Sequence, residues 1–395
     1  MKRPAVAALF AGLVAALAAR AVAATECPSL PTPVYVTGST AAKPLLAEIG
    51  KLMAAQTPPA TVVYMGQGSC TGVDAILAGT PMMGTGLSTW DANGVEMKCD
   101  ISLVNGVIAH VGISDVFAST CFQLPGGLPA SVTDVLGPVQ AMTFVTHRSS
   151  TEKSISAEAA YYVYGFGMNA QVQVPPWTYE ASIFRRDALS GTQAMIAAAI
   201  GVPADRWKGT ATTSSGDLVT RLGMVNFPDQ AIGILSAEVA QENRTTVKAL
   251  AFQNFGQSCA LFPDTTESAN DKANVRSGQY PIWGPLHLFT RVNTAGYPTN
   301  AKAGEVIGYL AGTRPAPAGL DLVKIEASRH AVPQCAMRVK RVQELGPAMP
   351  FVPIGACGCY YDLVATNTTT CQKCVTSSEC PTTAPACSYG YCEAQ

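Results

Sequence analysis

The stretch that decides the fold is "PVYVTGSTAAKPLLAEIGKLMAAQ", Pro33 to Gln56. Its first six residues form a short β-type run that ends at Gly38. The remainder repeats apolar residues along one helical face, namely Leu45, Leu46, Ile49, Leu52 and Met53. Ser39 or Thr40 is the predicted N-cap of this helix, and Pro44 falls where few backbone donors are needed. The stretch therefore predicts a strand, a tight turn and a helix.

The same alternation of strand-like and helical runs continues along the chain. Further strand-like runs are "TVVYMG" (61–66), "AHVGISD" (109–115), "AMTFVTH" (141–147), "ASIFRRD" (181–187), "AIGILS" (231–236) and "YPIWGPLHLFTRV" (280–292). Helical runs include "VDAILAG" (73–79) and "SGTQAMIAAAIG" (190–201), the second capped by Ser190 and closed by Gly201. Strands that alternate with helices indicate an α/β fold built on parallel strands.

We expect two α/β lobes, with the second inserted into the first. Lobe 1 comprises residues 27–143 and 283–355, and lobe 2 comprises residues 144–282. Two crossing segments, near 140–148 and 280–290, would form the hinge. From residue 356 to 395 the periodicity ends and Thr, Ser, Pro and Cys dominate, which predicts a separate disulfide-held tail.

The N-terminus has the pattern of a secretory signal peptide over residues 1–23. Lys2 and Arg3 precede an apolar segment, and Ala21-Val22-Ala23 is a small-x-small cleavage site. Its removal leaves 23 basic against 27 acidic residues. We therefore expect an exported protein, in the periplasm or at the cell surface. No later segment is long and apolar enough to span a bilayer, and no basic patch with interleaved aromatic residues indicates nucleic-acid binding.

All 13 cysteines lie in the predicted exported part, where disulfides are the default. The odd count predicts at least one cysteine outside an internal pair. "CQKC" (371–374) has zinc-like spacing, but the many cysteines nearby favour disulfides. The four histidines are dispersed, so we expect no metal site and no cofactor.

Small polar residues stand where strands end and helices begin. They occur in "GSTA" (38–41), "GSCTG" (68–72), "GISD" (112–115) and "RDALSGT" (186–192). Ligands of α/β sheets bind at the carboxyl ends of the strands, where helix N-termini offer unpaired N–H groups that suit an oxyanion. The repetition of these motifs predicts an anion site made of amides, hydroxyls and one guanidinium.

The order and spacing of these motifs resemble the phosphate-binding proteins that serve bacterial ABC importers, within the two-lobe periplasmic binding protein superfamily. The similar segments are "GSTAAKPL", "YMGQGSCTGVDAI", "GISD" and "RDALSGT", with weaker similarity in "AIGILS" and "YPIWGPLHLFTR". The resemblance spans roughly Val34 to Phe351. It implies a Venus-flytrap fold, inorganic phosphate as ligand, an ABC transporter permease as partner, uptake or sensing as role, and no enzymatic activity.

The resemblance also implies site residues. Thr40 would donate its hydroxyl and backbone N–H, joined by the Ala41 amide and by Ser39. Ser69 would donate from the second loop, and Arg186 would make a charge-assisted contact. Asp115 would accept from a protonated phosphate oxygen, which sulfate lacks. Lobe 2 would complete the site with Ser190, Gly191 and Thr192.

The sequence departs from the family at the acidic position and at the tail. Counted from Ser69, the expected Asp falls near Gly86 or Leu87, where none occurs. Asp115 fits if residues 88–110 are largely an insertion that is tied down through Cys99, and Asp91 is the alternative. The Cys-rich tail is not usual for transport receptors.

Two other functions stay open at this stage. One is a secreted or cell-surface interaction protein on a phosphate-binding-like scaffold with altered or lost ligand specificity. The other is a hydrolase of phosphate esters that reuses the oxyanion pocket. The sequence disfavours the hydrolase, because no nucleophile–base pair is apparent: "STEK" (150–153) lies in a polar loop without a KTG partner, and no GxSxG occurs.

Overall fold

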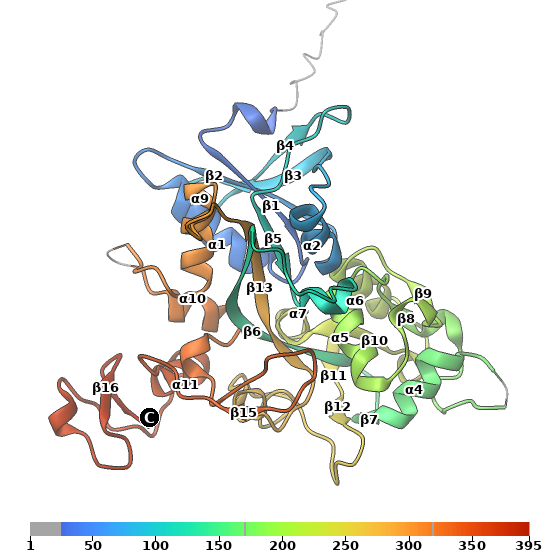
Figure 1. The fold of residues 1–395 in the computed structure, drawn as a ribbon. Helices are drawn as coiled ribbons and strands as arrows, with labels where there is room; N and C mark the ends of the chain where they lie inside the picture. Colours follow the sequence, from blue (N-terminus) through green and yellow to red (C-terminus); the bar gives the residue numbers. More distant parts are fainter. Residues whose placement is uncertain (1–24, 170, 318–319, 395) are drawn as a thin grey trace, which may run out of the picture.

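A computed structural model describes residues 25–169, 171–317 and 320–394 (Figure 1). The predicted signal peptide lies outside this range. The main sheet has nine strands in the order β10-β6-β13-β5-β1-β2-β3-β4, and β11 pairs with β6 beside β10. Its strands are β1 (Pro33–Gly38), β2 (Thr61–Gly66), β3 (Gly84–Trp90), β4 (Glu96–Ile101), β5 (Val111–Ser114), β6 (Val132–His147), β10 (Gly233–Ser236), β11 (Val247–Ala249) and β13 (Trp283–Arg291).

In Figure 1, some helices lie beside the upper part of this sheet, and others lie in the lower part of the molecule. They are α1 (Lys43–Ala54), α2 (Ser69–Leu77), α3 (Ala118–Cys121), α4 (Ala157–Phe166), α5 (Gly191–Ile200), α6 (Ser215–Gly223), α7 (Ala237–Glu242), α8 (Ala273–Arg276), α9 (Ala301–Leu310), α10 (Leu322–Ser328) and α11 (Gly358–Thr366). Four two-stranded sheets pair β7 (Ser154–Ser156) with β12 (Ala251–Gln253), β8 (Phe184–Arg185) with β9 (Thr210–Ala211), β14 (Val339–Lys340) with β15 (Met349–Pro350), and β16 (Ala386–Ser388) with β17 (Tyr391–Glu393).

The first helix buries the face that its sequence pattern predicts. All five apolar residues of that face are buried, in a core that α1 and α9 form with β1 and β2. A second core lies around α2 and includes the Cys27–Cys99 disulfide. A third, larger core joins α4, α5, α6 and β10 to the second half of β6. Burial of these apolar surfaces is the main stabilising contribution to the fold.

The main sheet is mixed, so the prediction of parallel strands holds only for its centre. β1 pairs in parallel with both β2 and β5. β3 and β4 form a hairpin, and β13 runs antiparallel to β5 and β6. A strand that follows a long intervening segment can pair in antiparallel orientation without a helical crossover. The local sequence pattern does not reveal this orientation.

Two long strands connect the upper and lower parts of the molecule. The first half of β6 pairs with β13, from Val132↔Arg291 to Ala141↔Trp283. The second half of β6 pairs with β10 and β11. In Figure 1, β6 and β13 run side by side through the middle of the molecule. Both segments predicted to cross between the lobes, near 140–148 and 280–290, therefore overlap these strands.

The C-terminal segment is held by disulfides. Within it, Cys359 pairs with Cys371, Cys374 with Cys387, and Cys380 with Cys392, while Cys335–Cys357 ties it to the preceding chain. "CQKC" is thus part of two disulfides. Cys27–Cys99 and Cys70–Cys121 complete the pairs, and among the described residues only Cys259 stays unpaired, on the surface.

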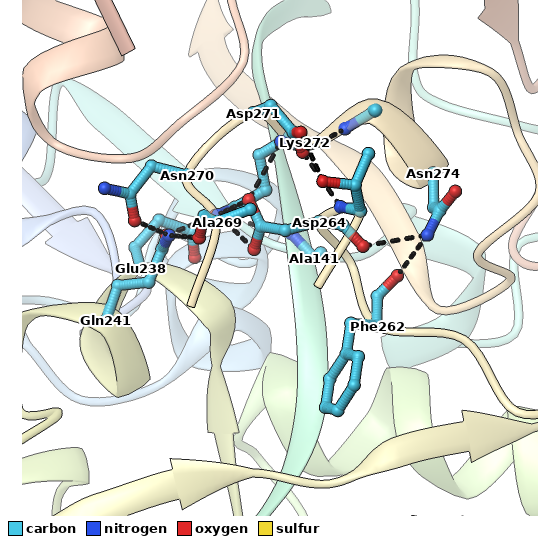
Figure 2. Close-up of polar contacts among 12 residues, drawn as sticks. Ala141, Glu238, Gln241, Phe262, Asp264, Ala269, Asn270, Asp271, Lys272 and Asn274 are labelled. Atoms are coloured by element: carbon cyan, nitrogen blue, oxygen red, sulfur yellow. Dashed lines mark hydrogen bonds and ion pairs between the residues drawn. The ribbon is translucent and has the colours of Figure 1, made fainter. Parts of the chain in front are cut away.

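A buried polar cluster lies where α7 approaches β6 (Figure 2). The Lys272 ammonium is 3.0 and 3.1 Å from the two carboxylate oxygens of Asp264 and also donates to Gln241. Lys272 is 1% and Asp264 5% exposed. Glu238 accepts weakly from the Ala141 amide at 3.4 Å through one oxygen, and its other oxygen is buried without a partner. The Lys272–Asp264 pair is therefore satisfied, whereas the Glu238 carboxylate is not.

We expect Glu238 to make stability depend on pH. Burial raises the pKa of Glu238 to about 8, and Lys272 only partly opposes the rise. A raised pKa in the folded state stabilises the protein as long as the carboxyl is protonated. This contribution to the free energy of unfolding is fully present below pH 4.5, the pKa of Glu238 in the unfolded chain, and is lost as pH rises through about 8. Between pH 5 and pH 8, the free energy of unfolding of the wild-type protein should fall by a value on the order of 2 kcal/mol, and that of Glu238→Gln should not show this fall. One pKa unit corresponds to about 1.4 kcal/mol, and local rearrangement of the protein around the charged carboxylate reduces the effect.

Urea unfolding of both proteins at pH 5 and pH 8 measures this difference. Glu158→Gln, on the exposed first turn of α4, is the control, because this carboxylate has no buried environment. An equal pH dependence in the wild-type protein and Glu238→Gln would contradict the expectation.

Candidate functional site

The predicted loops meet at the carboxyl ends of three adjacent strands. β1, β2 and β5 are parallel neighbours, so the residues that follow them lie at one edge of the sheet. Ser39 and Thr40 follow β1, Ser69 begins α2 just after β2, and Asp115 follows β5. The segment from Arg186 to Gly191, at the start of α5, approaches this edge from the other part of the molecule. Residues far apart in sequence are thus brought together.

The Asp115 carboxylate is the centre of this arrangement. It is 4% exposed, and the hydroxyls of Ser39 and Ser69 donate to its two oxygens, the latter at 3.0 Å. The Asp115 amide donates back to the Ser69 hydroxyl at 3.0 Å, and the Ala41 amide donates to that of Ser39 at 3.1 Å. Burial raises the pKa of Asp115, and the two serine hydrogen bonds oppose the rise. The carboxylate therefore fixes two loops relative to each other.

The predicted N-cap of α1, Ser39 or Thr40, is wrong because the helix begins further along the chain. The helix begins at Lys43 with Ala42 as N-cap, and no side chain caps it. Ser39 is fully buried, and its hydroxyl donates to Asp115. The hydroxyl oxygen accepts from the amide of Ala41, which precedes the helix, and so Ser39 caps no amide of α1.

Arg186 brings a buried positive charge beside these loops. It is 2% exposed, and one guanidinium nitrogen lies 3.4 Å from the Thr40 hydroxyl and 3.2 Å from the Ser215 hydroxyl. Its Nε is buried and has no hydrogen-bond partner among the residues that the structure describes. Burial lowers the pKa of Arg186, although a guanidinium stays protonated at neutral pH. A buried cation hydrogen-bonded to hydroxyls rather than to a carboxylate can accept an anionic ligand.

Glycines allow the two sides to approach. A Cβ on Gly191 would lie 2.2 Å from the Ser69 hydroxyl oxygen and 2.7 Å from a carboxylate oxygen of Asp115. Gly68 has a φ of +104°, and a Cβ there would lie 2.7 Å from the Leu189 carbonyl oxygen. That carbonyl accepts from the Cys70 amide at 3.1 Å. The start of α5 is therefore in direct contact with the start of α2.

We expect Gly191→Ala to push these two helix starts apart. The added methyl group overlaps Ser69 and Asp115, so one of the loops must shift. Overpacking of this kind costs about 1–3 kcal/mol, and it should weaken binding of any ligand held by both sides about tenfold or more. Gly126→Ala is the control, since nothing lies within 4 Å of its Cβ position. Calorimetric titration with phosphate would measure the effect, and equal affinities of the two variants would contradict it.

Not every predicted residue has a contact in this arrangement. The structure brings together Ser39, Thr40, Ala41, Ser69, Asp115, Arg186 and Gly191. Ser190 and Thr192 flank Gly191 and are each 3% exposed, and Ser190 is the N-cap of α5 without a side-chain capping bond. Asp91 lies instead in the turn between β3 and β4, where it accepts from the amides of Asn93 and Val95.

The segment before Asp115 includes the β3–β4 hairpin. Gly86 and Leu87, where the sequence count places the acidic residue, belong to β3. The β3–β4 hairpin adds to the edge of the main sheet, and Cys27–Cys99 ties it to the N-terminal segment. The structure therefore places Asp115, and not Asp91, beside Ser39 and Ser69.

Sequence reasoning missed two residues of the arrangement. The Tyr64 hydroxyl donates to the Ser39 carbonyl oxygen at 2.5 Å, and burial raises its pKa well above the usual value. Ser215 is the first residue of α6 and contacts Arg186. The segment "TTSSGD" (212–217) is a further hydroxyl-rich helix start, so the rule that found the other loops also applies to it.

The comparison with solved structures indicates the fold. No protein-family model matches the sequence, and neither does any curated protein. Among solved structures, a phosphate ABC transporter substrate-binding protein with bound phosphate from Clostridium perfringens matches with a TM-score of 0.51 and 13% identity, over 76% of this chain and 99% of that one. An ABC-type phosphate transport receptor from Vibrio cholerae matches with a TM-score of 0.48 and 13% identity, over 76% and 100%.

The architecture and the first of these matches define the class. The chain has the mixed α/β fold of periplasmic binding proteins, to which its C-terminal region adds a disulfide-rich segment. Within that class, the structure from Clostridium perfringens contains bound phosphate. In the described ranges, none of the helices has the length and hydropathy that a membrane span requires.

Proposed function

We propose that this protein is a non-enzymatic solute-binding protein that captures phosphate between two lobes. The observation that carries the proposal is Arg186, a buried guanidinium whose partners are hydroxyls and whose Nε is unpaired. It lies beside the Thr40 loop and near the N-terminus of α5, where backbone N–H groups favour an anion. Hydroxyl and amide donors around one cation suit a tetrahedral oxyanion.

The proposed lobes follow the sequence prediction, with residues 27–143 and 283–355 in lobe 1 and residues 144–282 in lobe 2. We propose β6 and β13 as the hinge, because these two strands connect the parts that carry Thr40 and Arg186. Opening would separate Gly191 from Ser69 and admit the anion, and closure would remove it from water. In a water-poor site each charge-assisted hydrogen bond is stronger than at the surface.

Asp115 gives the site a means of selection. Its oxygens accept from Ser39 and Ser69, and a carboxylate oxygen has a second lone pair that can accept from a protonated ligand oxygen. Phosphate carries such a proton near neutral pH, whereas sulfate does not and would be repelled. Ser190 and Thr192 would close the site from the side of α5.

Isothermal titration calorimetry with phosphate and with sulfate tests this function. We expect phosphate to bind about 100-fold more tightly than sulfate or better, because a buried carboxylate facing an unprotonated oxygen is costly. Absence of a phosphate heat from the well-folded protein would reject the proposal. Incubation with an aryl phosphate should release no phosphate, and turnover would favour a hydrolase instead.

The cellular setting is part of the same proposal. The predicted signal peptide and the six disulfides support an exported protein in the periplasm or at the cell surface. An ABC transporter permease is the proposed partner, as for the phosphate receptors that share the fold.

A further inference from the structure

A groove reaches the proposed anion site from outside. It has a volume of about 560 Å³ and lies between the end of β2, the first part of β3 and the start of α6. Its lining includes Thr40 and Ser215, the two hydroxyl partners of Arg186. Thr40 and Ser215 therefore lie between the buried guanidinium and a groove that is open to solvent.

The groove is much larger than an inorganic anion needs. A water molecule has about 30 Å³ of liquid volume, and a phosphate ion fills the room of only a few waters. Pockets of about 300–1,000 Å³ are typical of organic ligands. A groove of this size next to an anion site therefore has room for an organic group attached to the anion.

The lining indicates the character of that group. Met65, Met83 and Leu87 supply apolar surface, and Gln67 and Ser88 supply hydrogen-bonding groups. Lys43 also lines the groove, but its ammonium is held by Glu96 at 3.0 Å, so its charge is already balanced. A second anionic group, such as another phosphate, has no free cation among these residues. The groove thus favours a small, uncharged and partly polar group.

We propose that the site takes phosphate monoesters of small organic alcohols, with the phosphoryl group at Arg186 and the organic group in the groove. This inference rests on the proposed anion site and narrows its ligand class. The ester oxygen of the ligand then carries the organic group toward the groove, and the monoanionic form of the ester keeps one protonated oxygen for Asp115. The two remaining oxygens keep the donors from Thr40, Arg186 and the start of α5.

Calorimetry of the full exported chain with three probes tests the inference. The probes are inorganic phosphate, sn-glycerol 3-phosphate and phenyl phosphate, and glycerol alone is the blank. We expect at least one monoester to bind as tightly as phosphate or more tightly, and glycerol not to bind. Phosphate binding without measurable binding of either monoester would overturn the inference and leave the proposed function intact. Absence of binding by all three anions would instead reject the proposed function, and the inference with it.

A pair of variants locates the organic group. Gly216, on the first turn of α6, lines the groove, and the atom nearest to its Cβ position is the Ser214 hydroxyl oxygen at 3.8 Å. Gly216→Leu should therefore fill part of the groove and lower monoester affinity at least tenfold more than phosphate affinity. Thr220→Leu, one turn along the same helix and exposed, is the matched control that should leave this ratio unchanged. Equal ratios in both variants would show that the ester group lies elsewhere and would overturn the placement.

Discussion

Replacement of Arg186 by methionine is expected to weaken phosphate binding about 100-fold or more while leaving the folded protein at least as stable. The guanidinium is the buried cation of the proposed site, and its hydrogen-bond partners are the hydroxyls of Thr40 and Ser215. Loss of charge-assisted bonds in a desolvated site should cost about 3 kcal/mol or more, which is about 100-fold in affinity. Stability should not fall, because a hydrophobic side chain in place of a buried unpaired charge is often neutral or stabilising.

Arg185→Met is the matched control, since Arg185 is adjacent in sequence but bonds only to backbone carbonyl oxygens of Arg186 and Gly209. Calorimetric titration with phosphate gives the affinities, and urea unfolding without ligand gives the stabilities. If Arg186→Met still bound phosphate within a few-fold of the wild-type protein, the assignment of Arg186 to the site would be wrong. If Arg186→Met lost phosphate binding only because the variant was unfolded, its urea unfolding curve would reveal the loss of structure.

Replacement of Lys272 by methionine is expected to give the largest loss of stability. It leaves the Asp264 carboxylate buried without its cation, where the two are now 3.0 Å apart (Figure 2). Removal of one partner from a buried ion pair costs about 3–5 kcal/mol. The double variant Lys272→Met/Asp264→Asn should recover part of this loss, because it removes the stranded charge.

Arg148→Met provides the comparison for this pair. Arg148 contacts Glu267 at 2.6 Å, but its side chain is 52% exposed, so loss of the pair should cost about 1 kcal/mol or less. Urea unfolding with the disulfides intact measures all four proteins. A loss in Lys272→Met no greater than that in Arg148→Met, or no recovery in the double variant, would contradict the buried-pair argument.

Several features could be predicted from the sequence because each depends on a few neighbouring residues. The apolar face of α1 is confirmed, since a 3.6-residue period by itself specifies which side chains point to the core. The end of α5 at Gly201 is confirmed as well, because glycine adopts the left-handed conformation that closes a helix. The fold class follows from the alternation of such elements and is confirmed by the architecture.

The N-cap of α1, the strand directions and the cysteine pairs needed the structure. Local rules place the N-cap of α1 at Ser39 or Thr40, but the helix begins at Lys43, and a hydrogen bond joins Ser39 to Asp115, 76 residues away. The positions of the strands in the sequence do not show whether a strand such as β13 pairs in parallel or antiparallel orientation. Thirteen cysteines allow very many pairings, and only their positions in the fold select six.

By itself, the sequence determined the succession of strands and helices, the positions of the hydroxyl-rich helix starts, and the oxidised character of the chain. Only the tertiary structure decided that Asp115 rather than Asp91 joins Ser39 and Ser69, and that Arg186 lies buried beside Thr40, 146 residues away. The physical reason is range: backbone periodicity and turn chemistry act over a few residues, whereas contact between distant side chains depends on which strands become neighbours in the sheet.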